Sequence, residues 1–271
     1  MSDYLKNAPL GQSTGYVCEY DPSQLFPIPR GNNWQDRGYT KAPFRGCDLW
    51  NAYELSWLNS KGLPQVATAE FRVGCESPNI IESKSFKLYL NSFNLSRFES
   101  ADAVRQHLLE DLSQAAGAPV TVVIQSLEGQ ARIDQFEGEC LDQQDVEIEH
   151  YLPAPQLLRT LPGDPVEVQL YSHLLKSNCP VTGQPDWASI QIDYRGDPID
   201  KAGLLQYLVS YREHGDFHEH CVEQIFLDIL DRCEPAQLSV YARYVRRGGL
   251  DINPFRSTEA FSPDNIRLVR Q

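Results

Sequence analysis

The sequence of 271 residues has no apolar run that approaches the ~20 residues needed to span a bilayer. Its seven cysteines are odd in number and show no CxxC spacing, and no apolar segment follows a basic one at the N-terminus. These absences argue against a membrane protein, a disulfide scaffold and a secreted protein. We therefore expect a protein of the reducing cytoplasm that has no membrane partner.

Basic residues are also scarce, because 24 Lys and Arg stand against 37 Asp and Glu, which gives a net charge of −13. Such a charge repels polyanions, so we expect no direct binding of nucleic acid. A single nucleotide needs only a few local cations and stays possible. No GxGxxG motif follows a strand-like run, so a Rossmann domain is not indicated.

The chain contains an internal repeat. Residues 81–93 align with residues 199–211 at an offset of 118, and residues 66–73 align with 187–194 after a small indel. The first alignment matches Ile81 with Ile199, Tyr89 with Tyr207, Leu90 with Leu208 and Ser92 with Ser210. This self-similarity predicts two modules that arose by duplication.

Each copy begins with a run of alternating apolar and polar residues, NAYELSW at 51–57 and VEVQLYSHLL at 166–175, followed by a turn and a second alternating run. Each copy continues with two helical patterns and ends in strand-like sequence. The longer helices are expected at 101–117 and 218–233, with Ser100 capping the first and Gly117 ending it. The order predicts an α+β fold of antiparallel sheets with helices on one face. We expect an N-terminal arm over 1–40 that wraps the body, a first module over 41–150 and a second over 151–271, with residues 128–165 supplying a strand and a linker.

The segment SNCPVTGQPDW, residues 177–187, presents Cys179 on a turn rich in Pro and Gly, with Asp186 seven residues later. A thiolate is a strong nucleophile, and a nearby carboxylic acid can protonate the anion that its attack creates. This pair favours covalent catalysis. A buried cysteine that only packs is the alternative at this point.

The two copies differ in their polar residues. The first keeps Glu82, Ser83, Lys84 and Lys87, whereas the second carries the Cys179 turn and the segment FHEHC at residues 217–221. A solvated helix face would explain an isolated run of Lys and Glu. The division between the copies favours one composite site to which both modules contribute.

Four motifs occur in the order and at about the spacing of one known family. They are ESKSFKLY at 82–89, SNCPVTGQPDW at 177–187, FHEHC at 217–221 and RRGGLDINPFRS at 246–257. Over nearly its whole length, the chain resembles the NADPH-dependent 7-cyano-7-deazaguanine reductases, nitrile reductases of queuosine biosynthesis, in their two-module form. The resemblance implies tandem tunnelling-fold (T-fold) modules of ββααββ order, a homodimer or larger assembly, and sites at module interfaces.

The resemblance also implies the reaction and its residues. A deazapurine nitrile would be reduced by two NADPH through a covalent thioimide, with Cys179 as nucleophile and Asp186 as proton donor, and without a metal. Glu219 is our first choice for the guanine-type N–H edge, and Phe217 for stacking on the base. The full expected set is Ile81, Glu82, Ser83, Phe217, His218 and Glu219 for the substrate, and Ser83, Lys84, Arg247 and Gly248 for NADPH.

Two other functions stay open from the residues. Cys179, His218, His220 and Cys221 are ligand types that zinc accepts, and zinc-dependent T-fold cyclohydrolases have a similar architecture. The spacing is poor for zinc, because the adjacent residues His220 and Cys221 would point to different sides of a helix. A non-catalytic purine-binding protein would leave the pairing of Cys179 with Asp186 without a purpose.

Overall fold

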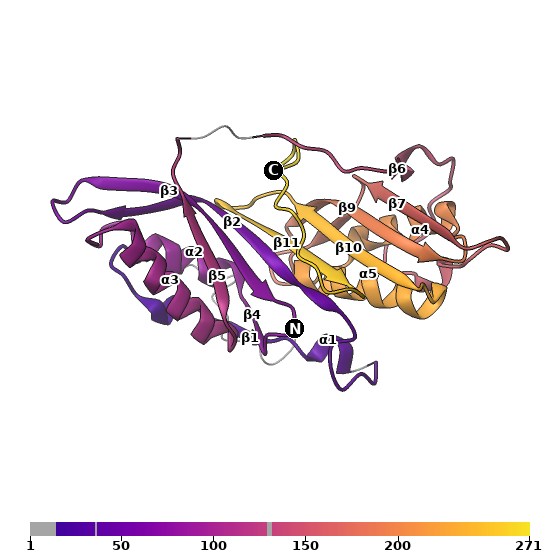
Figure 1. Cartoon of the computed structure of the whole chain (residues 1–271), viewed down its shortest axis with the longest axis horizontal. Helices are drawn as coiled ribbons and strands as arrows, with labels where there is room; N and C mark the ends of the chain where they lie inside the picture. The colour runs from indigo at the N-terminus through magenta and orange to yellow at the C-terminus, as the bar shows by residue number, and fades with distance from the viewer. Residues whose placement is uncertain (1–14, 36, 129–131) are drawn as a thin grey trace. The chain divides into compact units, whose positions relative to one another are not determined.

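The computed structural model describes residues 15–35, 37–128 and 132–271, which belong to two compact units (Figure 1). The first unit comprises Met1–Lys41, Asp48–Ala131 and Arg246–Ile252. The second comprises Ala42–Cys47, Arg132–Val245 and Asn253–Gln271. Each unit therefore contains a short segment from a distant part of the sequence, and the module boundaries expected above stay a prediction.

The first unit is a sheet with two helices, α2 and α3, on one face (Figure 1). Its strands run in the order β5-β3-β2, and β3 and β5 are antiparallel. Before α2, the short strands β1 and β4 form an antiparallel pair. The elements are η2 (Pro22–Gln24), β1 (Pro27–Pro29), α1 (Asn32–Gln35), β2 (Arg45–Leu58), β3 (Pro64–Gly74), β4 (Asn79–Ile81), α2 (Ser83–Ser92), α3 (Ala101–Ala116) and β5 (Val120–Gln125).

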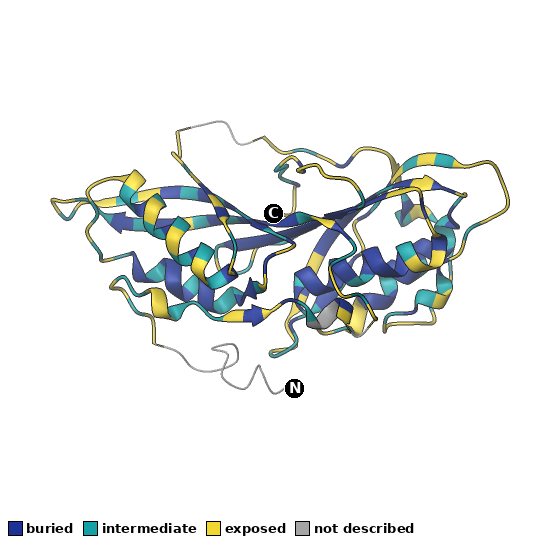
Figure 2. Cartoon of the chain, turned by 60° about the horizontal axis from the view of Figure 1, so that its bottom comes forward, coloured by how far each residue is buried: buried dark blue, intermediate teal, exposed yellow. Residues whose placement is uncertain are grey.

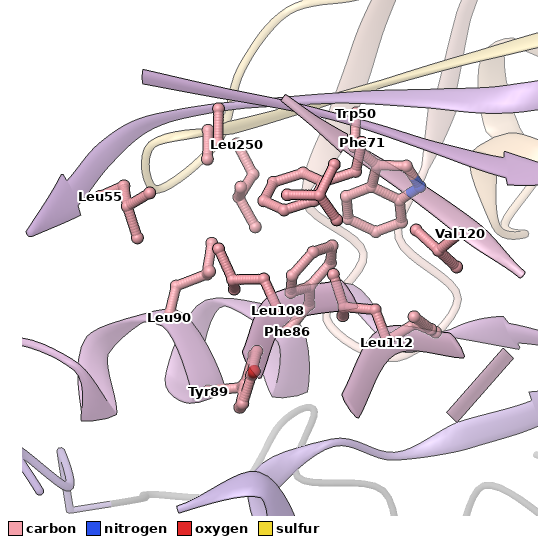
Figure 3. Packing of buried hydrophobic residues seen from close by; sticks show 14 of the residues in the cluster. Trp50, Leu55, Phe71, Phe86, Tyr89, Leu90, Leu108, Leu112, Val120 and Leu250 are labelled. Atoms are coloured by element: carbon pink, nitrogen blue, oxygen red, sulfur yellow. The ribbon is translucent and has the colours of Figure 1, made fainter. Parts of the chain in front are cut away.

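Because buried and partly exposed residues alternate along the strands, one face of this sheet is apolar, and this face packs against the helices. On β3, Ala67, Ala69, Phe71 and Val73 are buried while the residues between them are partly exposed. Figure 3 shows Phe71 and Trp50 pointing from the sheet toward Phe86 of α2, with ring centroids 5.1 Å and 5.0 Å from that ring. This core fixes α2, and with it the position of the ESKSFK motif.

The ends of α3 have the predicted caps. The Ser100 hydroxyl accepts a hydrogen bond from the Ala103 N–H at 3.1 Å, and Gly117 has a φ of 72°. A serine cap of this kind stabilises a helix by about 0.5–2 kcal/mol, and glycine adopts the left-handed conformation without steric cost. Both predictions are confirmed.

The second unit repeats the arrangement with additional strands. Its sheet has the order β11-β10-β9-β7-β6, antiparallel except for the β6–β7 pair, and β8 pairs with β9. The helices α4 and α5 cover one face (Figure 1). The elements are β6 (Glu139–Cys140), η3 (Leu141–Gln143), η4 (Pro155–Leu157), β7 (Val166–Ser172), β8 (Lys176–Asn178), β9 (Pro185–Gly196), α4 (Lys201–Val209), η5 (Ser210–Glu213), α5 (His218–Cys233), β10 (Gln237–Tyr244) and β11 (Leu250–Ser257).

Helix α5 is enclosed on more than one side, as its colouring in Figure 2 indicates. Five consecutive residues, 219–223, are buried, which a helix lying on a sheet with one face in solvent would not show. Phe44, from the short segment Ala42–Cys47 of this unit, packs edge-on against Phe226 with ring centroids 5.6 Å apart. The charged residues Glu219 and Glu223 of α5 are therefore buried.

One strand prediction needs correction. The alternating run 166–175 indicated a single strand, but β7 ends at Ser172 and β8 begins at Lys176. Asp142 accepts hydrogen bonds from the Ser172 hydroxyl at 2.6 Å and from the His173 N–H at 3.0 Å. These bonds turn the chain after Ser172, so that β8 forms a separate hairpin with β9. Among the described residues, no helix is long and apolar enough to cross a membrane.

Candidate active site

The loop that carries Cys179 connects β8 and β9. In this antiparallel pair Ser177 lies opposite Asp186 and Asn178 lies opposite Pro185. The Cys179 N–H then donates to the Gln184 carbonyl at 2.9 Å. Because side chains alternate along a strand and opposed residues share a face, Ser177, Cys179 and Asp186 point to the same side of the hairpin. That side is buried, as all three side chains show.

Cys179 is buried and has a backbone donor at its sulfur. Its side chain is 6% exposed. The Thr182 N–H lies 3.5 Å from the sulfur and donates toward it. This contact links the thiol to the turn of its own loop.

The chain before α5 pairs with the cysteine hairpin. The Asn178 N–H donates to the His214 carbonyl at 2.8 Å, and the Asp216 N–H donates to the Asn178 carbonyl at 3.1 Å. Helix α5 begins two residues later, at His218, after Phe217 at the N-cap position. The hairpin bonds thus hold the FHEHC segment beside Cys179.

Asp186 and His218 meet on the buried side of the hairpin. Asp186 is 3% exposed, and its Oδ1 lies 3.4 Å from His218 Nε2. This separation is at the long end of the range for a hydrogen bond. The geometry brings an acid and an imidazole to the same side of the hairpin as the thiol.

The residues after His218 form an acidic, buried environment. Burial lowers the pKa of His220, but hydrogen bonding to Asp216 together with the charges of Asp216, Glu223 and Glu219 outweighs this effect and raises it overall. His220 Nδ1 lies 3.1 Å from Asp216 Oδ1, and Glu219 is 3% exposed. Phe217 packs edge-on against the His220 ring at 5.6 Å. The first turn of α5 therefore holds a buried carboxylate and an aromatic ring.

A buried ion pair anchors the next turn of α5. Arg256 on β11 contacts Glu223 at 2.7 Å, and neither side chain is exposed. Arg256 also donates to the Cys47 carbonyl at 3.2 Å. Removing one partner from a buried pair costs about 3–5 kcal/mol, because the other charge stays behind. The sequence analysis assigned no role to this pair, although Arg256 lies in the RRGGLDINPFRS motif and Glu223 lies one turn after Glu219.

In the first unit, Glu82 caps α2. Its carboxylate accepts hydrogen bonds from the Lys84 and Ser85 N–H groups, both at 2.7 Å. Burial raises the pKa of Glu82, and these two bonds oppose that effect. Ile81 belongs to the hydrophobic core and is 4% exposed, so its side chain is committed to packing. The local roles of both residues are structural, and their expected contacts with substrate stay predictions.

The RRGG segment forms a tight turn in the same unit. Arg247 and Leu250 exchange backbone hydrogen bonds at 2.8 Å and 3.3 Å. Gly248 and Gly249 have φ values of 58° and 80°, the left-handed conformation that a two-residue hairpin turn of this type requires. A Cβ atom on Gly248 would collide with Nζ of Lys87. The turn therefore packs directly against α2.

This packing sets one of the expected cofactor residues beside the helix that carries two others. Ser83 and Lys87 are four residues apart on α2 and share a face of the helix. Gly248 lies against the Lys87 side chain, and the grouping of Ser83, Lys84, Arg247 and Gly248 in one site stays a prediction. Lysine and arginine beside a glycine that permits close approach can bind phosphate groups. Within the described ranges, no group of three or more His, Cys, Asp or Glu side chains could hold a metal ion.

Two family models match the chain. Residues 16–124 match "Nitrile reductase, 7-cyano-7-deazaguanine-reductase N-term", and residues 185–262 match "QueF-like protein". The matches and the fold together define a nitrile reductase with two T-fold modules, each a sheet with helices packed on it. The predicted α+β fold class is thereby confirmed.

Curated relatives of the same length specify the family. Proteins named "NADPH-dependent 7-cyano-7-deazaguanine reductase" from Bordetella pertussis and Dechloromonas aromatica are each 58% identical. The first alignment covers 98% of this chain and 99% of the relative, and the second covers 97% and 95%. The chain belongs to the family of NADPH-dependent 7-cyano-7-deazaguanine reductases. A crystal structure of the archaeosine synthase QueF-Like in the apo form matches with a TM-score of 0.32 and 14% identity, over 37% of this chain and 100% of that chain.

Proposed function

We propose that this enzyme, which reduces the nitrile of 7-cyano-7-deazaguanine to the primary amine in queuosine biosynthesis, does so through a covalent thioimide on Cys179. The observation that carries the mechanism is the β8–β9 hairpin, in which Asp186 lies opposite Ser177, two residues before Cys179, and in which both Cys179 and Asp186 are buried. A nitrile carbon accepts hydride poorly. Capture by a thiolate converts it into a C=N bond that accepts hydride as an imine does.

The Cys179 thiolate forms a C–S bond to the nitrile carbon while Asp186 protonates the nitrogen, giving the thioimide. Hydride addition to that carbon gives a hemithioaminal, which expels the thiolate and leaves an imine. A second hydride and a second proton complete the amine. NADPH supplies the hydrides when it is bound, so each nitrile consumes two NADPH and two protons.

The protein excludes water from this chemistry. Both the thioimide and the imine hydrolyse readily, so the reacting carbon must be kept away from solvent until reduction is complete. Cys179 and Asp186 are 6% and 3% exposed, which supports such a role for the hairpin. Mixing the purified enzyme with substrate and NADPH tests the function. We expect two NADPH oxidised per amine formed, whereas oxidation without amine, or a ratio near one, would contradict the proposal.

Substrate recognition is assigned to the start of α5. Glu219 would accept two N–H groups of the deazapurine edge, because a carboxylate forms stronger bonds to paired donors than a neutral acceptor does. Phe217 would stack on the base and His218 would lie beside it. Ile81, Glu82 and Ser83 are the other residues proposed to contact the substrate.

The Glu219→Gln variant is expected to bind substrate more weakly, by about 1.5–3 kcal/mol, because a charge-assisted hydrogen bond is lost. Isothermal titration of 7-cyano-7-deazaguanine into proteins that also carry Cys179→Ala, which bind the substrate without forming the adduct, measures the change. The exposed carboxylate Glu213 provides the control, since Glu213→Gln should bind as the wild type does. Unchanged affinity in Glu219→Gln would move base recognition to another residue.

NADPH binding is assigned to Ser83, Lys84, Arg247 and Gly248. We expect Lys84→Ala to leave thioimide formation intact and to impair only the reduction, because the lysine would neutralise cofactor phosphate and has no part in thiolate attack. The NADPH concentration needed for half-maximal turnover should rise, and the thioimide should accumulate at limiting NADPH.

Lys61, an exposed lysine of the same unit, serves as the matched control. Lys61→Ala should leave both the adduct and the NADPH requirement unchanged. A folded Lys84→Ala protein that fails to form the adduct would show that this lysine acts on the substrate instead.

The assembly and compartment are also proposed. The enzyme would act as a homodimer or larger homo-oligomer in the reducing cytoplasm. All seven cysteines are free in the structure, which supports a reducing compartment.

A further inference from the structure

Tyr244, the last residue of β10, packs flat against His218. The two ring centroids are 3.8 Å apart and the ring planes differ by 2°. Tyr244 is completely buried. The sequence analysis assigned it no role, because it lies in an alternating run that is typical of a core strand.

The backbone of Tyr244 is held by two buried side-chain amides. Its N–H donates to Asn253 Oδ1 at 3.1 Å, and its carbonyl accepts from Gln271 Nε2 at 3.0 Å. The two amides also bond to each other at 2.8 Å, and Arg243 Nε donates to Gln271 Oε1 at 2.9 Å. With the pairing of Tyr244 opposite Ala188 on β9, these bonds leave the ring little freedom to move.

The imidazole of His218 has few other constraints. Its Nε2 lies 3.4 Å from Asp186 Oδ1, and its Nδ1 has no hydrogen-bond partner in the part of the chain that the structure describes. One long polar contact does not fix the plane of a ring, because the ring can turn about that contact. The flat contact with Tyr244 supplies the missing constraint and keeps Nε2 directed at Asp186.

The hydroxyl of Tyr244 makes no comparable contribution. It is buried without a hydrogen-bond partner among residues 15–35, 37–128 and 132–271. Burial and the neighbouring Cys221 raise the pKa of Tyr244 well above its ordinary value, and the nearby Ser177 opposes this only in part. The Ser177 hydroxyl is likewise buried without a hydrogen-bond partner in the described part of the chain. The Tyr244 phenol thus stays neutral.

We propose that Tyr244 is a positioning residue for proton donation by Asp186: its ring fixes the imidazole of His218 against the Asp186 carboxyl, and its hydroxyl takes no part. The proposal rests on the function proposed above, because it concerns the proton given to the nitrile nitrogen. Because the ring and the hydroxyl of Tyr244 are given different roles, substitutions that remove the hydroxyl alone or the whole ring can test each role.

The test measures the rate of thioimide formation, by absorbance, after mixing each variant with 7-cyano-7-deazaguanine without NADPH. Tyr244→Phe keeps the ring and should react as fast as the wild type. Tyr244→Leu removes the ring and should slow the limiting rate by roughly 10- to 100-fold, the usual consequence of a misplaced catalytic group. The substrate concentration for half-maximal rate should not change.

Two controls separate positioning from general damage. Tyr194 is a buried tyrosine on β9 of the same sheet, whose hydroxyl donates to the Asp197 carbonyl at 2.6 Å, and Tyr194→Leu should leave the rate unchanged. In a His218→Ala background, Tyr244→Leu should have no further effect, because Tyr244 acts through His218. Should Tyr244→Leu not fold, Tyr244→Met applies the same test.

Three results would overturn the proposal. A Tyr244→Phe variant as slow as Tyr244→Leu would show that the hydroxyl takes part in the reaction. A normal rate in folded Tyr244→Leu would show that the ring is not needed, and additive effects with His218→Ala would show that it acts by another route. A wild-type enzyme that forms no adduct would instead refute the proposed function, which the positioning role presupposes.

Discussion

Replacing Cys179 with alanine is expected to abolish both nitrile reduction and the thioimide absorbance, while the substrate still binds. No neighbouring thiol can take over. Cys221 is completely buried, and burial raises its pKa well above the ordinary value, so its sulfur stays protonated and unreactive. Absorbance on mixing with substrate and the rate of NADPH oxidation measure the two losses, and calorimetry confirms binding.

Cys233, at the end of α5, provides the matched control. Burial raises the pKa of this thiol to about 11, so it is protonated at neutral pH, as Cys221 is. Cys233→Ala should therefore form the adduct and turn over as the wild type does. An adduct on the Cys179→Ala protein would exclude Cys179 as the nucleophile.

The Asp186→Asn variant is expected to bind substrate but to form the thioimide at least about 10²-fold more slowly, because general acid catalysis typically contributes 10²–10⁴-fold. The amide has the size of the carboxyl group but cannot give a proton to the nitrile nitrogen. Rapid-mixing absorbance without NADPH isolates this step from hydride transfer.

Asp193 lies on the same strand, where its carboxylate accepts a hydrogen bond from Ser239 at 2.8 Å. Asp193→Asn should react at the wild-type rate. Equal rates in wild type and Asp186→Asn would remove Asp186 from the mechanism and assign the proton to another group.

The repeated architecture could be predicted because its signals are local. Alternation over 51–57 and 187–194 predicted β2 and β9, and the periodic run 218–233 coincides with α5. Ser100 and Gly117 identified the ends of α3, since a capping hydroxyl and a left-handed glycine act within one turn. The first 14 residues of the expected N-terminal arm lie outside the described residues.

Features that depend on distant residues could not be predicted in the same way. The break between β7 and β8 depends on Asp142, which lies 30 residues before Ser172. The turn at Gly248 belongs to the first unit although it follows the second repeat in sequence. No periodicity within either segment indicates these contacts.

In the candidate site, too, features set by a short stretch of sequence could be predicted, whereas features that depend on distant residues could not. Cys179 and Asp186 were proposed from one short motif, and their placement on one face follows from the hairpin register. Tyr244 and the Arg256–Glu223 pair were missed, because a tyrosine in a core strand and a glutamate in a helix have ordinary structural roles. Only the ring contact with His218 and the complete burial of the ion pair distinguish them.

The most direct test of the covalent mechanism is the intact mass of the wild-type enzyme after mixing with 7-cyano-7-deazaguanine in the absence of NADPH. Without hydride the thioimide cannot react further, so the mass should increase by that of one substrate molecule, and peptide mapping should locate the addition on Cys179. An unmodified mass, under conditions in which calorimetry shows the substrate bound, would contradict the covalent mechanism.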